Sequence, residues 1–123
     1  GGNTKAAMMR IGFDEMRKFI LLFTPCKEEV FWQSCGIADL ITTCYGGRNR
    51  KCSEMYARHD GKKSFAEIEK ELMNGQLLQG PGTLREVYEV LEARKLLEKF
   101  PLFTRLYEIV FLKHPVKSLF DLE

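Results

Sequence analysis

The sequence has few cysteines, no long apolar run and no Cys-x-x-Cys pair. Its four cysteines lie eight or nine residues apart, and its two histidines are far from one another. A zinc site needs closer pairs of ligands, so no metal is predicted, and reduced, mostly buried thiols in a cytoplasmic protein are expected. The apolar run Phe19–Phe23 is far too short to cross a bilayer, and the first five residues show no signal-peptide pattern.

The sequence also lacks a strong charge of either sign. Nineteen Lys and Arg against seventeen Asp and Glu give a net charge of +2. A nucleic-acid-binding domain carries a longer basic stripe than the short cluster Arg48–Lys51. There is no Gly-x-Gly-x-x-Gly, Walker loop or βαβ pattern, so no dinucleotide is expected to bind unaided. We therefore predict neither a nucleic-acid nor a membrane partner.

What the sequence does have is helical patterning along its whole length. Its 123 residues, 45% hydrophobic, suffice for one domain, residues 1–123. Apolar residues recur at steps of three and four, and no segment alternates with a period of two. We predict an all-α fold of seven or eight helices. They are expected over residues 4–23, 27–34, 37–45, 48–58 and 64–73, from 83, from 100 to the interruption at 114, and over 116–122.

Several helix starts carry recognisable signals. Asn3 or Thr4 can cap the first helix. Ser64–Glu67 and Thr83–Glu86 each have the form of a capping box, and Pro101 suits the first turn of a helix. The abrupt start directly before a long amphipathic helix is typical of a piece of a larger protein.

The segment Ile37–Lys51 is the predicted site. Asp39 and Thr43 are four residues apart on an otherwise apolar helix, so they share one face. Burial of Asp39 among its apolar neighbours would cost several kcal/mol unless it finds partners. Gly46–Gly47 then allows close backbone approach, and Arg48 with Asn49 follows at a helix start, where anions bind well. The pattern predicts an anion site, although Asp39 and Thr43 could equally make local structural hydrogen bonds.

Other features have two interpretations each. Arg50 and Lys51 are typical of a solvated helix face, and His59 of a solvated loop. The breaker-rich segment Asn74–Gly82 is either a mobile lid or an ordinary connection between helices. For the whole chain, the alternatives are part of an enzyme, a non-catalytic helical module that binds a phosphorylated ligand, or a helical scaffold without a ligand.

A resemblance narrows these alternatives. The stretches 2–7, 35–51, 74–80 and 99–103 resemble the C-terminal domain of NAD-dependent glycerol-3-phosphate dehydrogenases of the eukaryotic cytosolic type. The resemblance implies an all-helical substrate domain after an N-terminal Rossmann domain that this chain does not contain. It also implies a homodimer that interconverts dihydroxyacetone phosphate and sn-glycerol 3-phosphate with NADH or NAD.

The resemblance implies a role for individual residues. Asp39 matches an aspartate that supports the catalytic lysine, and Thr43 a hydroxyl that orders the carbonyl end of the substrate. Arg48 and Asn49 match the pair that binds the substrate phosphate, while Arg48 and Gln79 match cofactor contacts. The proton-donating lysine of the family lies upstream of this chain, which alone is expected to be inactive. Many family members also have a lysine where this chain has Leu77.

Overall fold

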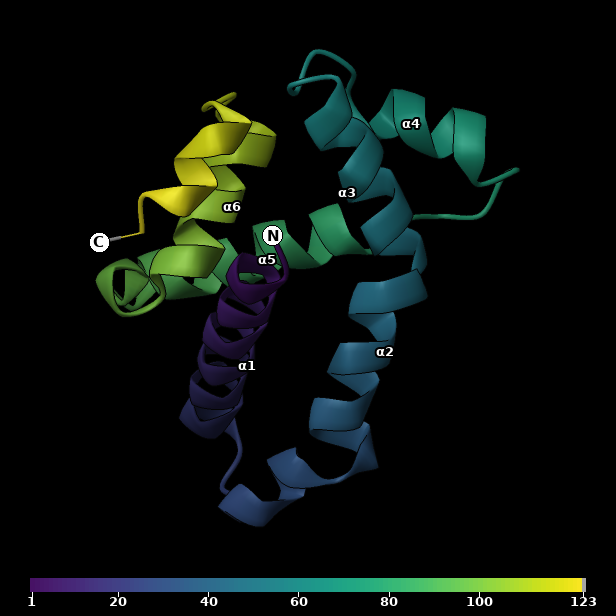
Figure 1. Cartoon of the computed structure of the whole chain (residues 1–123). Coiled ribbons are helices and arrows are strands. Elements are labelled where there is room, and N and C mark those ends of the chain that lie inside the picture. Colours follow the sequence, from purple (N-terminus) through teal and green to yellow (C-terminus); the bar gives the residue numbers. More distant parts are fainter. Residues whose placement is uncertain (123) are drawn as a thin grey trace. The chain divides into compact units, whose positions relative to one another are not determined.

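The computed structural model describes residues 1–122, and this part of the chain is helical with no β-strand (Figure 1). The prediction of an all-α fold is confirmed. By its internal contacts the chain divides into two units, residues 1–47 and 48–123. None of the helices in residues 1–122 is both long enough and apolar enough to cross a membrane.

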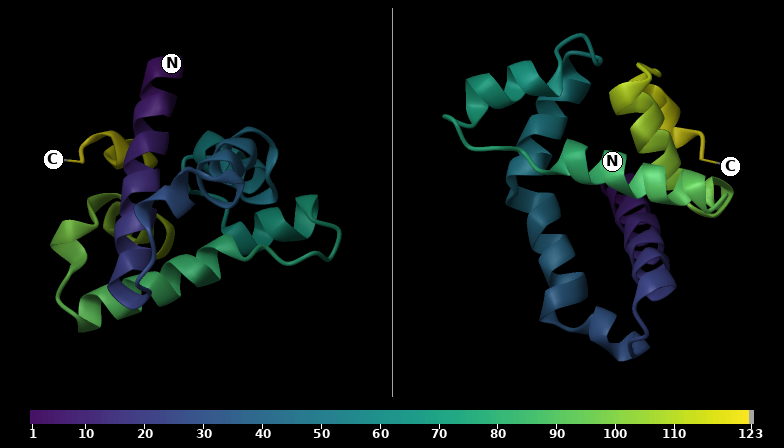
Figure 2. Two further views of the ribbon diagram at one scale, coloured as in Figure 1. Left: turned by 90° about the horizontal axis from the view of Figure 1, so that it is seen from below. Right: turned by 180° about the vertical axis from the view of Figure 1, so that it is seen from behind.

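The first unit contains two α-helices joined by two short segments. Helix α1 (Gly2–Phe23) is followed by the 3₁₀-helix η1 (Glu28–Trp32), the π-helix η2 (Ser34–Ala38) and α2 (Asp39–Gly46). Thr24 is extended, as a residue before proline must be, and this ends α1. The chain reverses through η1 and η2, and α2 then contacts α1 (Figures 1 and 2).

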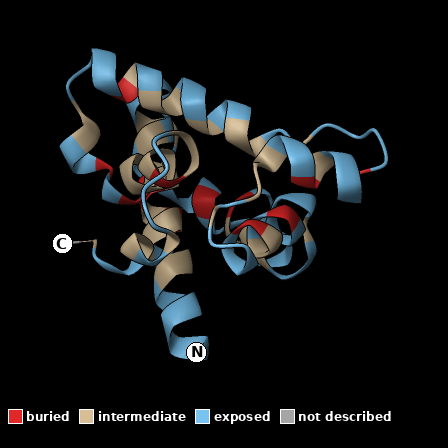
Figure 3. Cartoon of the chain, turned by 90° about the horizontal axis from the view of Figure 1, so that it is seen from above, coloured by how far each residue is buried: buried red, intermediate tan, exposed pale blue. Residues whose placement is uncertain are grey.

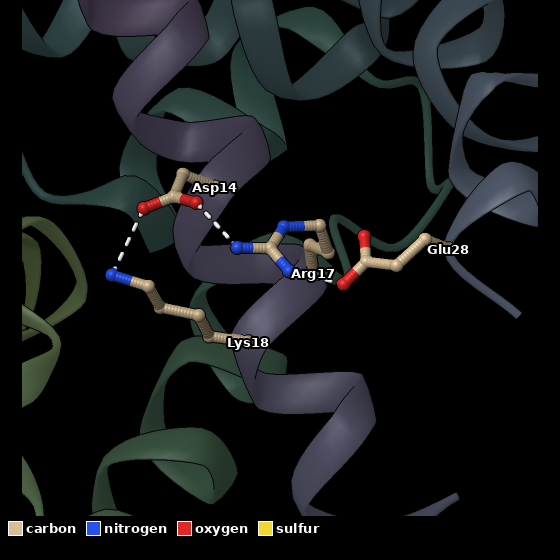
Figure 4. A network of polar contacts seen from close by, with 4 residues as sticks. All are labelled: Asp14, Arg17, Lys18 and Glu28. Atoms are coloured by element: carbon tan, nitrogen blue, oxygen red, sulfur yellow. Dashed lines mark hydrogen bonds and ion pairs between the residues drawn. The ribbon is translucent and has the colours of Figure 1, made fainter. Parts of the chain in front are cut away.

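Polar and aromatic contacts hold η1 against α1. Arg17 on α1 pairs with Asp14 at 2.9 Å and reaches Glu28 on η1 at 2.7 Å, while Lys18 pairs with Asp14 at 3.0 Å (Figure 4). The Phe13 ring, which is buried, lies 5.4 Å from the ring of Trp32, centroid to centroid. These side chains fix the turn that leads from α1 towards α2.

The described residues of the second unit, 48–122, contain four α-helices. They are α3 (Arg48–Arg58), α4 (Phe65–Leu72), α5 (Gly80–Ala93) and α6 (Pro101–Phe111), with short 3₁₀-helices η3 (Leu97–Lys99) and η4 (Val116–Phe120). Helix α3 packs on α4, and α6 packs on α5, η3 and η4. Buried positions occur as short bands along the helices (Figure 3). The principal buried cluster consists of Cys52, Tyr56, Ile68, Met73 and Ile109.

We predicted seven or eight helices, whereas residues 1–122 contain six α-helices. Two expected helices, 27–34 and 116–122, are 3₁₀-helices of five residues each. Each begins shortly after a proline, Pro25 or Pro115, and closes with hydrogen bonds over three residues, such as Ser118 N–H to Pro115 O at 2.9 Å. Segments of five residues are too short to form a regular α-helix, in which each hydrogen bond spans four residues.

The predictions of helix starts had mixed outcomes. The Ser64 cap is confirmed, since its Oγ accepts a hydrogen bond from the Glu67 amide at 3.2 Å. Pro101 lies in the first turn of α6, as predicted. The cap at Asn3 or Thr4 is wrong, because α1 already begins at Gly2. The predicted cap at Thr83 is also wrong, because α5 already begins at Gly80. The Thr83 amide donates a hydrogen bond to the Gln79 carbonyl, as an amide within the first turn of a helix does.

Candidate functional site

Asp39 and Thr43 lie one turn apart on α2, as the sequence predicted. Both residues are exposed, and no residue of α2 is buried. The expected burial of Asp39 is therefore wrong: its apolar neighbours Ile41 and Leu40 are themselves accessible or only half-buried. An exposed carboxylate incurs no large desolvation cost, and it remains available to a cationic partner.

The predicted break after α2 is at Gly47. Its amide donates to the Thr43 carbonyl at 3.0 Å, and its backbone is extended, with φ −71° and ψ 162°. A Cβ at this position would lie 3.0 Å from the Thr43 carbonyl oxygen and 3.1 Å from Thr43 Cγ2, whereas one on Gly46 would meet open space. A side chain at residue 47 would therefore pack tightly against Thr43, whereas one at residue 46 would not.

Arg48 and Asn49 form the first turn of α3, and both are exposed. The Arg48 guanidinium donates to Gln76 Oε1 at 3.4 Å, across 28 residues of sequence. Asn49 Oδ1 accepts a hydrogen bond of 3.2 Å from the Gly80 amide. The segment from Gln76 to Gly80 therefore contacts both side chains that the sequence assigned to an anion.

Gln79 stands next to Gly80, at the N-cap position of α5, and is exposed. Together with Asn49 it lines a cavity of about 470 Å³ within the second unit. The rest of the lining is largely apolar and comes from α3, α4, α5 and α6: Ser53, Phe65, Pro81, Leu84, Val87, Phe103, Leu106 and Val110 among others. Asn49 and Gln79 thus line the same cavity.

The basic residues that follow Asn49 have a different environment. Arg50 pairs with Glu54 at 3.1 Å, and Arg58 pairs with the same carboxylate at 2.9 Å. The hydrogen bond from Arg58, with the charge of Arg50, holds the pKa of Glu54 below its usual value. These pairs follow one exposed side of α3, so Arg50 belongs to a solvated helix face, as its spacing indicated.

The cysteines do not form a metal-binding cluster. In residues 1–122, no three His, Cys, Asp or Glu side chains come together as metal ligands would, and all four cysteines are free. Cys52 is fully buried, and this burial raises the pKa of its thiol. A thiol held in its protonated form is a poor nucleophile and a poor ligand, so Cys52 serves as a core residue.

The five residues predicted from the sequence fall into two sets. Asp39 and Thr43 belong to the first unit, while Arg48, Asn49 and Gln79 belong to the second. Sequence reasoning missed the partners of the second set, Gln76 and Gly80. The available signal was the dense group of glycines and glutamines at positions 75–82, which was interpreted as a loop or lid.

Comparisons with known proteins agree along nearly the whole chain. A family profile described as "NAD-dependent glycerol-3-phosphate dehydrogenase C-terminus" matches residues 1–121. A glycerol-3-phosphate dehydrogenase (NAD(+)) of Cuphea lanceolata is 57% identical over 110 residues, which cover 89% of this chain and 30% of that protein. The human cytoplasmic glycerol-3-phosphate dehydrogenase (NAD(+)) is 52% identical over 118 residues, 94% of this chain and 33% of that protein.

Solved structures give the same result. The chain is similar to a glycerol-3-phosphate dehydrogenase from Saccharomyces cerevisiae, with a TM-score of 0.91 and 46% identity over 99% of this chain and 35% of that one. The enzyme from Plasmodium falciparum gives a TM-score of 0.92 at 38% identity, with 99% and 34% covered. This chain spans about a third of the length of the relatives that it matches.

Proposed function

Since this chain belongs to the family of the C-terminal part of NAD-dependent glycerol-3-phosphate dehydrogenases, we propose that it is the substrate domain of such an enzyme. The reaction would interconvert dihydroxyacetone phosphate and sn-glycerol 3-phosphate with NADH and NAD. The match covers about a third of the relatives' length, so the activity would also involve the part of those proteins that lies outside the match. This domain alone is expected to be inactive.

The observation that carries the proposal is the anchoring of Arg48 and Asn49. They are consecutive residues at the start of an 11-residue helix, and each is hydrogen-bonded to the segment between Gln76 and Gly80. A guanidinium can bind two phosphate oxygens at once, and a carboxamide can donate to a third. The positive end of the helix dipole at the start of α3 favours the same negative charge. This arrangement suits a phosphate monoester.

Asp39 and Thr43 would act at the other end of the substrate. A carboxylate close to a lysine favours the charged form of that lysine, which is the form that can donate a proton to the carbonyl oxygen. Asp39 is exposed and can meet a lysine contributed by the missing part of the enzyme. The Thr43 hydroxyl, one turn further on the same helix, can donate a hydrogen bond that orders the carbonyl end.

The cofactor would be bound mainly by the missing N-terminal domain, with Arg48 and Gln79 as contacts from this chain. Both residues are exposed, and Gln79 lines the same cavity as Asn49, so both can reach a ligand outside the domain. NADH supplies the hydride for the ketone carbon. Leu77, where relatives of the family often have a lysine, is 74% exposed and offers no charge to the cofactor phosphates.

The partners follow from the same proposal. We expect the enzyme to be a cytoplasmic homodimer without nucleic-acid or membrane partners, and the name of the human relative specifies the cytoplasm. Several large apolar side chains on α1 and η1 are exposed in this chain, and a covering protein surface would stabilise them: Ile20, Leu22, Phe23, Val30 and Trp32.

The test is the Arg48→Ala substitution in the native protein that carries this chain, assayed by oxidation of NADH with dihydroxyacetone phosphate. We expect the KM for dihydroxyacetone phosphate to rise by about two orders of magnitude, because a charged, doubly hydrogen-bonded contact is lost. Arg50→Ala is the matched control, since Arg50 pairs with Glu54 on the same helix, and its KM should stay at the wild-type value.

Two results would contradict the proposal. An unchanged KM in Arg48→Ala would remove Arg48 from the phosphate site. If the native protein does not oxidise NADH with this substrate and yet binds glycerol 3-phosphate in calorimetry, the chain is a non-catalytic helical module for a phosphorylated ligand.

A further inference from the structure

We propose that Gly80 is a positioning residue of the phosphate site, which fixes the orientation of the Asn49 carboxamide so that its NH₂ group faces the phosphate. The inference rests on the proposed function and adds a residue to the same site. It depends on two separate observations, a hydrogen bond and a steric contact, and both join the first residue of α5 to the second residue of α3.

The hydrogen bond determines which end of the carboxamide faces α5. Gly80 is the first residue of α5, so its amide has no acceptor inside the helix. This N–H can only donate, and the atom that receives it at 3.2 Å is Asn49 Oδ1. The Nδ2 atom is then turned away from the start of α5, and both of its protons remain for other acceptors.

The orientation matters because the two ends of a carboxamide are electrically opposite. With Oδ1 occupied by Gly80, Asn49 presents two donors to its other side, which suits the oxygens of an anion. The reverse orientation would place the oxygen lone pairs towards the phosphate and repel it. Arg48 is held from the same segment by Gln76, so one stretch of chain orients both phosphate ligands.

The steric contact explains why residue 80 is a glycine. Its φ is not in the left-handed region, so the backbone conformation itself would accept alanine. A Cβ at this position would instead collide with Asn49 Oδ1 and lie 3.0 Å from Asn49 Cγ. The obstructing atoms belong to the end of an exposed side chain, which can rotate away. Alanine at residue 80 should therefore displace the Asn49 carboxamide and leave the fold intact.

The experiment compares Gly80→Ala with Gly82→Ala in the native protein that carries this chain. Gly82 lies two residues further in α5, and a Cβ there would meet nothing within 4 Å, so it is the matched control. We expect Gly80→Ala to raise the KM for dihydroxyacetone phosphate about tenfold, as the loss of one hydrogen bond to a charged group does. The KM for NADH and the thermal midpoint should stay near wild type. Gly82→Ala should match wild type in all three.

A second arm separates positioning from a general structural role. In an Asn49→Ala background the side chain that Gly80 orients is gone, so Gly80→Ala should cause no further rise in KM. Asn49→Asp keeps an acceptor for the Gly80 amide but has no NH₂, and its KM should rise at least as much as that of Asn49→Ala. This variant tests the orientation even if Gly80→Ala does not fold.

The outcomes are distinct from those of the proposed function. A wild-type KM in Gly80→Ala, a full additional effect of Gly80→Ala in the Asn49→Ala background, or a wild-type KM in Asn49→Asp would each overturn the inference while the enzyme remains active. If the wild-type protein does not reduce dihydroxyacetone phosphate with NADH, the proposed function itself fails.

Discussion

The Tyr56 hydroxyl on α3 donates a hydrogen bond of 3.0 Å to the backbone carbonyl of Ile109 on α6. Ile109 is in the last turn of its helix, and the chain leaves the helix before Lys113, whose φ of 61° is left-handed. The Ile109 carbonyl therefore has no helical donor four residues later, and Tyr56 supplies one. Tyr56 is 4% exposed and stacks on Phe65 at 4.5 Å, so one side chain joins α3, α4 and α6.

This contact predicts the effect of Tyr56→Phe. The ring and its stacking remain, but a buried carbonyl loses its donor, which should lower the free energy of unfolding by about 1–2 kcal/mol. Equilibrium urea unfolding of the native protein measures the change. Tyr45→Phe is the control, because the Tyr45 side chain is 66% exposed and its hydroxyl can bond water. Equal unfolding midpoints for Tyr56→Phe and wild type would contradict the prediction.

Helices with strong local signals could be predicted from the sequence. The bounds of α3, Arg48–Arg58, were predicted as they occur, and the end of α1 at Phe23 follows from Pro25. In both cases the determining groups are neighbours along the chain, a glycine pair before the helix or a proline after it. Cys52 and Tyr56, four residues apart on the apolar side of α3, are both buried.

The start of α5 could not be predicted in this way. Gly80, Pro81 and Gly82 are typical of a loop, and they form the first turn of a helix instead. Proline suits that turn, because it has no N–H to satisfy. The Gly80 amide, which has no acceptor inside the helix, donates a hydrogen bond to Asn49 Oδ1, 31 residues earlier in the chain. A local sequence pattern cannot predict so distant a partner.

In the site, too, the residue types could be predicted from the sequence, but the long-range contacts could not. Its side chains were visible as residue types in Ile37–Lys51, but the contacts that orient Arg48 and Asn49 come from a segment that was interpreted as a lid or connection. The burial of Asp39 was overestimated because apolar neighbours in sequence were taken to be buried. Ile41, for example, is 42% exposed. Apolar composition alone does not show whether a surface faces the core or another protein surface.

The proposed role of Asp39 predicts a specific kinetic change. Asp39→Asn keeps the shape of the side chain but removes the charge that favours a protonated lysine, so kcat should fall by about a hundredfold, with a smaller change in KM. Steady-state kinetics of the native protein measure both constants. Asp60→Asn is the control: it removes the same charge at a turn with φ 50°, a conformation that asparagine adopts readily. A wild-type kcat in Asp39→Asn would remove this residue from the reaction.

The network around Asp14 predicts a dependence of stability on pH. The hydrogen bond from Arg17, followed by that from Lys18, lowers the pKa of the Asp14 carboxyl from its ordinary value of 3.8. A lowered pKa in the folded state stabilises the protein above the unfolded pKa, and this contribution is lost as the pH falls through the folded pKa. Since the Asp14 side chain is 37% exposed, we expect Asp14→Asn to cost less than about 1 kcal/mol at pH 7.

The difference between wild type and Asp14→Asn should therefore be largest at neutral pH. It should shrink as the pH falls below about 4, where the carboxyl of the unfolded chain takes up a proton, and disappear below the lowered pKa of folded Asp14. Urea unfolding at a series of pH values measures this difference. Glu29→Gln removes one negative charge from η1, outside the network of Figure 4, and controls for the change in net charge. A cost of Asp14→Asn that stays the same from pH 7 to below the folded pKa would show that the residue acts through packing and not through its charge.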